Sequence, residues 1–235
     1  MRGVNEHTTL CERCGYDLSA AKVERCPECG LDADLSDPTR RVGSALQRWP
    51  GDPRAWAADL VGMALRPKAF WSRVRVESHR SAWLLAANGA LAAIMLVVPI
   101  GSSARFGATV FGIANSLVVA WVAFSMLSAI EYAGLRVFGR RRGWRVTHSV
   151  SIAVTGHTSA AWVVGAALAS VGFYLGQIPP AQPIHPSLWS PNSPIPPAAA
   201  TWEFVLPVVG WMVGFVVFET WTYAGWRAMR FANRA

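Results

Sequence analysis

Long apolar runs alternate with short polar segments over the last two-thirds of the chain. Four runs, at 81–100, 108–130, 150–175 and 204–226, each contain at least twenty residues. An α-helix rises about 1.5 Å per residue, so about twenty residues cross a hydrocarbon core of about 30 Å. The pattern therefore predicts an all-α integral membrane protein with a four-helix transmembrane bundle.

Polar segments surround this membrane domain, which we place at 81–226. Residues 1–35 hold all the cysteines, and the following stretch is polar and rich in turn-forming residues. The predicted order before and after the spans is a small head (1–35), a flexible linker (36–52), two amphipathic helices (53–80) and a basic tail (227–235).

The two amphipathic helices are predicted from their start signals and apolar spacing. Asp52 can cap the first helix with Pro53 in its first turn, and Pro67 can end that helix and begin another. Apolar residues recur at helical spacing beside basic ones, which is typical of helices lying in the headgroup layer. The alternative is that these faces pack on the head or on another subunit. The apolar positions are Trp56, Leu60, Met63, Phe70, Trp71 and Val74.

Charge is distributed unevenly along the chain. The formal net charge is +8, and residues 1–80 contain 13 of the 22 Lys and Arg and 11 of the 14 Asp and Glu. The remaining basic residues cluster at the ends of the apolar runs, where membrane orientation and anionic headgroups explain them. Nucleic acid is therefore not an expected partner, whereas the lipid bilayer is.

An arginine-dense stretch from Arg136 to Arg145 separates the second and third runs. Such a stretch is hard to translocate, so it predicts a cytoplasmic loop. The alternating spans then place both termini in the cytoplasm. The three cytoplasmic segments receive thirteen, five and three basic residues, and the two external loops receive one and none. We therefore expect a multi-pass protein of the cytoplasmic or inner membrane.

The four cysteines form two CxxC pairs, Cys11–Cys14 and Cys26–Cys29, with eleven residues between them. Each second cysteine is followed by a glycine, which permits the left-handed turn of a metal-binding knuckle. Four thiolates close a tetrahedral site with no open position, so the predicted site is structural. Two disulfides are the alternative, but they require an oxidising compartment, which does not fit a cytoplasmic head.

The bound metal is predicted to be zinc, with iron as the alternative. Cys-Gly-Tyr followed by Cys-Pro-x-Cys-Gly, over about Cys11–Gly30, resembles both zinc ribbons and rubredoxin-like domains. The second resemblance implies a single iron that transfers electrons. Such an iron site is usually packed under several aromatic side chains, and the head offers only Tyr16.

Small residues recur every four positions in the last two runs, which lets helix backbones approach closely. They predict either packing within one bundle or an interface with a second copy of the chain. The positions are Ala161, Gly165, Ala169, Gly172, Gly176, Gly210 and Gly214.

Three ionisable residues, Glu131, His157 and Glu219, lie in or beside the apolar runs. His157 and Glu219 are at similar depth from the arginine-rich side, so they could face each other in a proton- or ion-coupled site helped by Asn88 or Asn115. The simpler alternative is structural. In that case Glu131 and Glu219 pair with nearby Arg136 and Arg227 at the membrane surface.

Leu65-Arg66-Pro67-Lys68-Ala69-Phe70-Trp71 resembles the segment before the membrane domain of the Yip family of multispanning proteins. Gly139-Arg-Arg-Arg-Gly143-Trp144 is similar to that family's central polar loop. This chain has four predicted spans where five are usual in the family. The resemblance implies a non-enzymatic protein of membrane organisation or trafficking, and it carries over no catalytic residue.

No enzyme motif such as HExxH, GxSxG or a P-loop occurs. The expected function is a membrane-embedded interaction or scaffold protein whose zinc ribbon docks a protein partner. The alternatives are a small-solute or ion transporter that uses the His157 and Glu219 region, and a rubredoxin-like electron-transfer protein.

Overall fold

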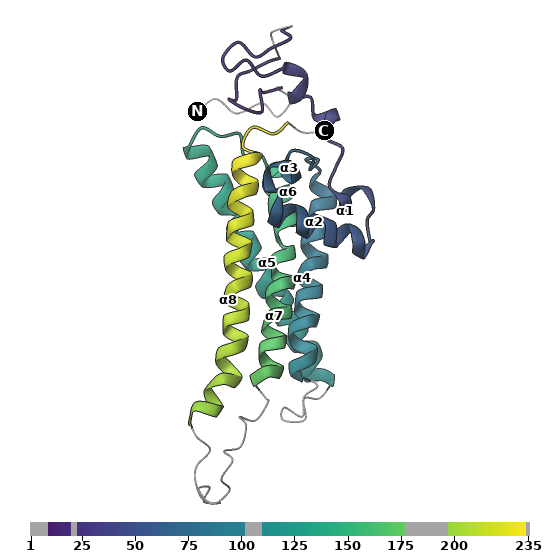
Figure 1. The fold of residues 1–235 in the computed structure, drawn as a ribbon, viewed down its shortest axis with the longest axis vertical. Helices are drawn as coiled ribbons and strands as arrows, with labels where there is room; N and C mark the ends of the chain where they lie inside the picture. The colour runs from purple at the N-terminus through teal and green to yellow at the C-terminus, as the bar shows by residue number, and fades with distance from the viewer. Residues whose placement is uncertain (1–8, 20–22, 102–109, 177–196, 234–235) are drawn as a thin grey trace, which may run out of the picture. The chain divides into compact units, whose positions relative to one another are not determined.

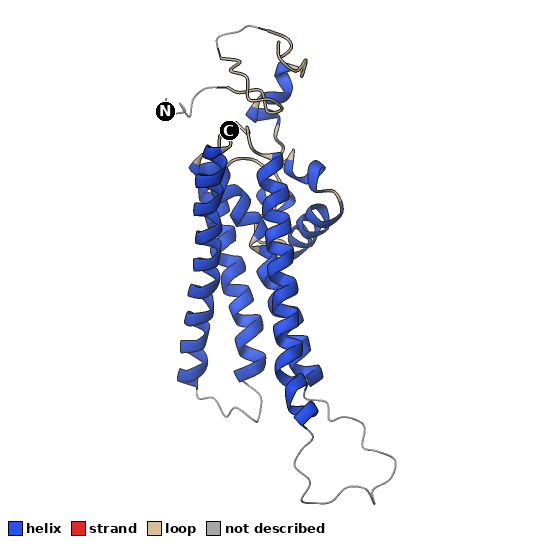
Figure 2. Cartoon of the chain, turned by 90° about the vertical axis from the view of Figure 1, so that its left-hand side faces the viewer, coloured by secondary structure: helices blue, strands red, loops and turns tan. Residues whose placement is uncertain are grey.

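The computed structural model describes residues 9–19, 23–101, 110–176 and 197–233, without side-chain detail at 99–101, 110–111 and 197–204. The two predicted external loops lie almost entirely outside these residues. The described part of the chain is helical and contains no strand (Figure 2). The predicted all-α fold class is therefore confirmed.

Within the described residues, four helical segments are long and apolar enough to cross a membrane, in agreement with the four predicted runs. They belong to the last helices labelled in Figure 1. These are α4 (Ser78–Gly101), α5 (Val110–Arg141), α6 (His148–Thr158), α7 (Ala160–Gly176) and α8 (Pro197–Ala228).

The described residues before α4 contain two 3-10 helices and three α-helices. They are η1 (Ala33–Ser36), η2 (Pro38–Arg40), α1 (Ala45–Arg48), α2 (Pro53–Leu65) and α3 (Pro67–Trp71). As the start signals predict, the Asp52 side chain accepts a hydrogen bond from the Arg54 amide at the start of α2, and α3 begins at Pro67. The segment 36–52, predicted to be a flexible linker, contains η2 and α1 and buries Arg41, Ser44 and Gln47.

The arginine-rich stretch is mostly helical, not a loop. The α5 helix continues to Arg141, eleven residues beyond the predicted end of the second span. A turn at Arg142 and Gly143 follows, and Gly143 has a φ of 71°. Arginine has a high helix propensity, so a run of arginines does not by itself end a helix.

The third span consists of two helices, α6 and α7, separated at Ser159. The hydroxyl groups of Thr155, Thr158 and Ser159 donate to carbonyl groups of the preceding turn, namely Ser151, Val154 and Gly156. Such bonds compete with the helix's own ladder and often bend it. The cluster of hydroxyl residues therefore explains the interruption.

The chain forms two compact units. The first contains Met1–Ala86, Ser125–Ala160 and Glu219–Ala235, and the second contains Ala87–Phe124 and Ala161–Phe218. Helices α4, α5 and α8 contribute residues to both units.

The core of the first unit is built around Trp71, whose side chain is 1% exposed. Met63, Val74, Val154 and Met229 belong to the same buried cluster. A Cβ atom on Gly225 would lie 2.6 Å from the Trp71 ring, so α8 packs closely on this indole. The apolar face of α2 and α3, which we expected against lipid headgroups, is thus largely covered by the chain's own helices.

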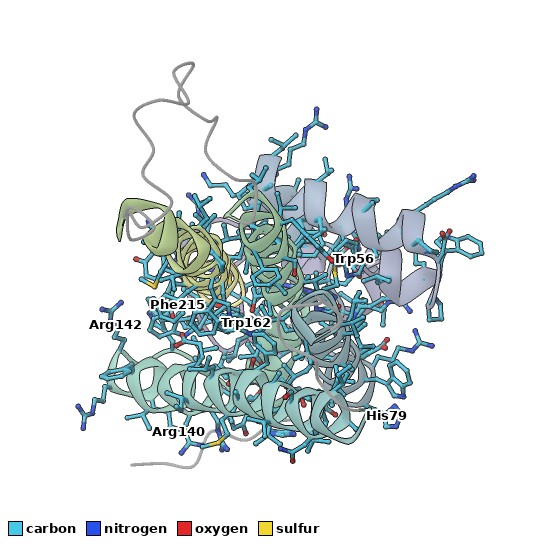
Figure 3. The ribbon with its side chains drawn as sticks, turned by 90° about the horizontal axis from the view of Figure 1, so that it is seen from below. Trp56, His79, Arg140, Arg142, Trp162 and Phe215 are labelled. Carbon is cyan, nitrogen blue, oxygen red and sulfur yellow. The ribbon has the colours of Figure 1, made fainter. Side chains whose placement is uncertain are left out.

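The core of the second unit is aromatic. Trp162, 1% exposed, lies 4.5 Å from Phe218 and 5.9 Å from Trp211 between ring centroids. Figure 3 shows the Trp162 side chain beside that of Phe215. Their ring centroids are 6.3 Å apart. Next to these rings the backbones of α7 and α8 meet at glycines, and a Cβ on Gly165 would lie 2.8 Å from the Gly214 Cα. The small-residue ridges therefore pack against each other within this chain.

Candidate metal centre and its attachment

The four cysteines converge on one point in the head. Their sulfur atoms all lie within 4.8 Å of one another. The Sγ atoms of Cys11 and Cys29 are 3.5 Å apart and those of Cys14 and Cys26 are 3.6 Å apart, and no disulfide joins them. A zinc–sulfur bond of about 2.3 Å implies sulfurs about 3.8 Å apart in a tetrahedron. The arrangement therefore fits one tetrahedral metal ion.

The two CxxC pairs adopt the same backbone conformation. Gly15 and Gly30 have positive φ angles of 85° and 69°, in the region that glycine adopts without strain. In each knuckle the glycine amide donates to the carbonyl of the first cysteine, Cys11 at 2.8 Å and Cys26 at 2.9 Å. The repeated Cys-x-x-Cys-Gly sequence thus folds into two equivalent knuckles, as predicted.

Backbone amides also point at the sulfur atoms. Desolvation raises the pKa of the Cys26 thiol, but hydrogen bonds from the amides of Cys29 and Glu28 outweigh it and lower the pKa to about 7. Desolvation is the largest influence on Cys14 and raises its pKa to about 12. Four neighbouring thiols cannot all ionise without a compensating cation, and a bound metal ion would supply that cation.

A buried arginine attaches the head to α3. The Arg41 side chain forms a two-point ion pair with Glu12, with nitrogen–oxygen distances of 2.7 and 3.2 Å. Its remaining terminal nitrogen donates to the carbonyl oxygens of Trp71 and Val74, both at 2.9 Å. Since Arg41 is only 5% exposed, this contact holds the first knuckle firmly on the first unit's core.

The C-terminal segment is attached to the head as well. Asn233, 4% exposed, accepts a hydrogen bond from the Leu10 amide and donates to the carbonyl oxygens of Leu10 and Ser36. Arg145 donates to the same Asn233 oxygen at 3.2 Å. The tail after α8, predicted only as a basic extension, is therefore part of the packed unit.

His157 has partners other than Glu219. Its Nδ1 lies 2.8 Å from the Ala153 carbonyl oxygen, and its Nε2 lies 3.2 Å from the Ser44 hydroxyl. A carbonyl only accepts, so Nδ1 carries the proton and Nε2 accepts from Ser44. Both ring nitrogens are thus occupied by Ala153 and Ser44, and neither is bonded to Glu219, the partner that similar depth made possible.

Ser44 belongs to a buried polar network around α1. The Ser44 hydroxyl accepts a hydrogen bond from the backbone amide of Gln47, and the side-chain oxygen of Gln47 accepts one from the backbone amide of Ser44. These two bonds form a capping box. Asp59 on α2 accepts hydrogen bonds from the next two amides of α1, those of Ala45 and Leu46. The N-terminus of α1 is therefore fully satisfied by side chains.

Glu131 and Glu219 are half-buried, and their carboxylates are close enough for their charges to interact. Among the described residues neither carboxylate forms an ion pair with Arg136 or Arg227. Arg136 instead donates to the Tyr132 hydroxyl at 2.9 Å. The predicted structural pairs at the membrane surface are therefore not found in the described part of the chain.

Sequence reasoning missed Arg41, Ser44 and Asn233 as site-forming residues. Ser44-Ala-Leu-Gln47 is a readable capping-box signal. Nothing in the sequence around Arg41 or Asn233 distinguishes them from their exposed neighbours, because their role depends on contacts with distant residues.

Comparisons with protein families, curated proteins and solved structures give no match for this chain.

Proposed function

We propose that this protein is a non-enzymatic, membrane-embedded interaction or scaffold protein whose four-cysteine head is a cytoplasmic zinc ribbon that docks a protein partner. The observation that carries the proposal is the closed set of four thiol ligands at Cys11, Cys14, Cys26 and Cys29. A metal ion with four protein ligands has no open position for a substrate, so its role is structural. It would stabilise the fold of the head and thereby the surface that the head presents to a partner.

The attachment of the head supports a docking role. Arg41 and Asn233 hold the first knuckle by hydrogen bonds to Glu12 and Leu10. A docking surface held in this way loses little conformational freedom when a partner binds. The exposed side of the head offers charged residues next to the apolar Val23 and Leu35, which are 37% and 54% exposed.

The proposed orientation places the head, both termini and the arginine-rich end of α5 in the cytoplasm. It rests on the distribution of basic residues between the predicted segments. Membrane organisation or trafficking, which the Yip-like motifs imply, is the corresponding cellular role.

The two alternatives have less support. A transport site at His157 and Glu219 would need a histidine free to exchange protons, and both nitrogens of His157 have partners within the protein. An electron-transferring iron would use the same cysteines. Such an iron site is usually packed under several aromatic side chains, whereas here only Tyr16 belongs to the described cluster around the cysteines, and Phe231 lies against Gly15.

The first test is the metal content and visible spectrum of the full chain purified in detergent. We expect about one colourless zinc per chain, lost in a Cys11→Ser/Cys26→Ser variant. Iron with thiolate charge-transfer bands would instead support the electron-transfer alternative and contradict the zinc assignment.

The second test addresses docking. A photo-crosslinking residue placed at the exposed Glu28 in the head should form a discrete adduct with another protein in cells. The adduct should disappear in the Cys11→Ser/Cys26→Ser background. The matched control carries the same probe at Arg54, exposed on α2. Equal labelling at both positions, or labelling that survives loss of the cysteines, would contradict a docking role for the head.

A further inference from the structure

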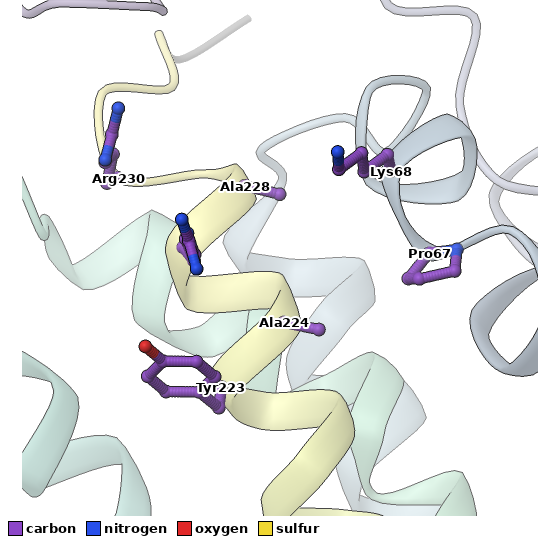
Figure 4. Close-up of a pocket in the computed structure, with 7 residues that line it drawn as sticks. Pro67, Lys68, Tyr223, Ala224, Ala228 and Arg230 are labelled. Carbon is purple, nitrogen blue, oxygen red and sulfur yellow. The ribbon is translucent and has the colours of Figure 1, made fainter.

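A groove with a mainly apolar surface and three basic residues in its lining lies between α3 and the end of α8 (Figure 4). Its volume is about 540 Å³, within the range of about 300–1,000 Å³ typical of small-molecule sites. Ala224 and Ala228 point from α8 toward the segment that carries Pro67 and Lys68. The described residues that line it are Pro67, Lys68, Tyr223, Ala224, Arg227, Ala228 and Arg230.

Three cations and no carboxylate are found among the described residues that line this groove. Lys68 and Arg227 are exposed, and neither forms an ion pair among the described residues. Arg230 is held in place, because it donates to the Arg13 carbonyl oxygen at 3.1 Å and lies over the rings of Trp144 and Phe231. Its guanidinium is therefore positioned before any ligand arrives. The groove is complementary to an anion.

The position of the groove along α8 indicates where that anion comes from. The apolar span of α8 runs over Val205–Ala228, so Arg227 lies at its very end. This is the depth at which a bilayer presents its headgroups. The alanines, Tyr223 and Pro67 would contact the glycerol and upper acyl region of a lipid, whereas a free phosphate ion would gain nothing from them.

We propose that this groove binds the phosphate headgroup of an anionic membrane phospholipid, with Lys68, Arg227 and Arg230 as its cationic ligands. The lipid would bridge α3 and the end of α8 beside the metal-binding head, to which Arg230 is directly hydrogen-bonded. A specific site of this kind goes beyond the general attraction of basic segments to an anionic leaflet. It also does not depend on the docking function proposed for the head.

The test compares lipids on the full-length protein in detergent. Phosphatidylglycerol is titrated against phosphatidylcholine, and binding is followed by thermal stabilisation and by lipid retention in native mass spectrometry. We expect the wild type to bind phosphatidylglycerol preferentially. In the Lys68→Gln/Arg227→Gln variant the apparent affinity should fall about 25-fold, since each cation near an anionic surface contributes about a fivefold effect.

The matched control is Arg54→Gln/Arg140→Gln, which removes two exposed cations outside the groove and should keep the preference. Equal binding of both lipids by the wild type, or an unchanged preference in the groove variant, would overturn the proposal. Stabilisation by inorganic phosphate equal to that by phosphatidylglycerol would overturn the lipid as the ligand. If the double variant does not fold, Lys68→Gln alone, with an expected loss of about fivefold, decides the question.

Discussion

The side-chain amide of Asn233 pairs with the backbone of Leu10, 223 residues earlier in the chain, in the way that two strands pair. The Leu10 amide donates to Asn233 at 3.0 Å, and Asn233 donates to the Leu10 carbonyl at 2.8 Å. Two segments near opposite ends of the sequence are thereby joined beside the cluster of four cysteines.

Replacing Asn233 by alanine should loosen the head. The change leaves the buried Ser36 carbonyl and the part-buried amide and carbonyl of Leu10 without their partner. A buried group left unsatisfied costs about 1–3 kcal/mol, and a part-buried group costs less because water can reach it. We expect faster hydrogen exchange at the Leu10 amide and faster release of the metal to a chelator. The exposed Arg54→Ala change serves as the control. Unchanged exchange at Leu10 in Asn233→Ala would show that the tail does not stabilise the head.

Arg41 and Arg40 provide a comparison between adjacent arginines. Arg41→Lys loses the two-point contact with Glu12 and at least one of the two buried carbonyl contacts, because an ammonium group cannot reproduce the planar guanidinium. We expect a loss of about 2–3 kcal/mol in unfolding free energy. Arg40→Lys alters the ion pair between Arg40 and Asp34, whose side chains are 53% and 71% exposed, respectively. This change should lower the unfolding free energy by less than about 1 kcal/mol. Chemical denaturation in detergent measures both, and equal effects would contradict the buried role of Arg41.

The bond between His157 and Ser44 can be measured by a double-mutant cycle. His157→Leu should destabilise the protein by about 2 kcal/mol and Ser44→Ala by about 1 kcal/mol, since each removes buried hydrogen bonds. The pair should show a coupling energy of about 1 kcal/mol. His79→Leu, at an exposed histidine, is the control. Additive effects of His157→Leu and Ser44→Ala would show that the two side chains do not interact.

Gly165→Ala tests the close contact of α7 and α8. The new Cβ would lie 2.8 Å from the Gly214 Cα, closer than real carbon atoms approach, so the helices must separate. We expect destabilisation of about 1–3 kcal/mol, as for other overpacked sites. Gly134→Ala meets nothing within 4 Å and should be neutral or stabilising, because alanine has the higher helix propensity. A stable Gly165→Ala protein would contradict this packing.

Local sequence patterns determined the elements of this protein. Four apolar runs become helices long enough to cross a membrane, and Asp52 and Pro67 mark where α2 and α3 begin. The cysteine spacing determined the two knuckles, because a CxxCG segment constrains its own backbone through the glycine and the short loop. These features depend on residues close together in the chain, so they can be read without the fold.

The tertiary structure alone decided which polar residues are buried and what they contact. Similar depth made it possible for His157 to face Glu219, but the capping box that begins α1 brings Ser44 to its Nε2 instead. Arg40 and Arg41 are indistinguishable in sequence, yet only Arg41 is enclosed between the head and α3. Depth along a helix and residue type do not specify which face meets which neighbour, because that depends on packing between segments far apart in the chain.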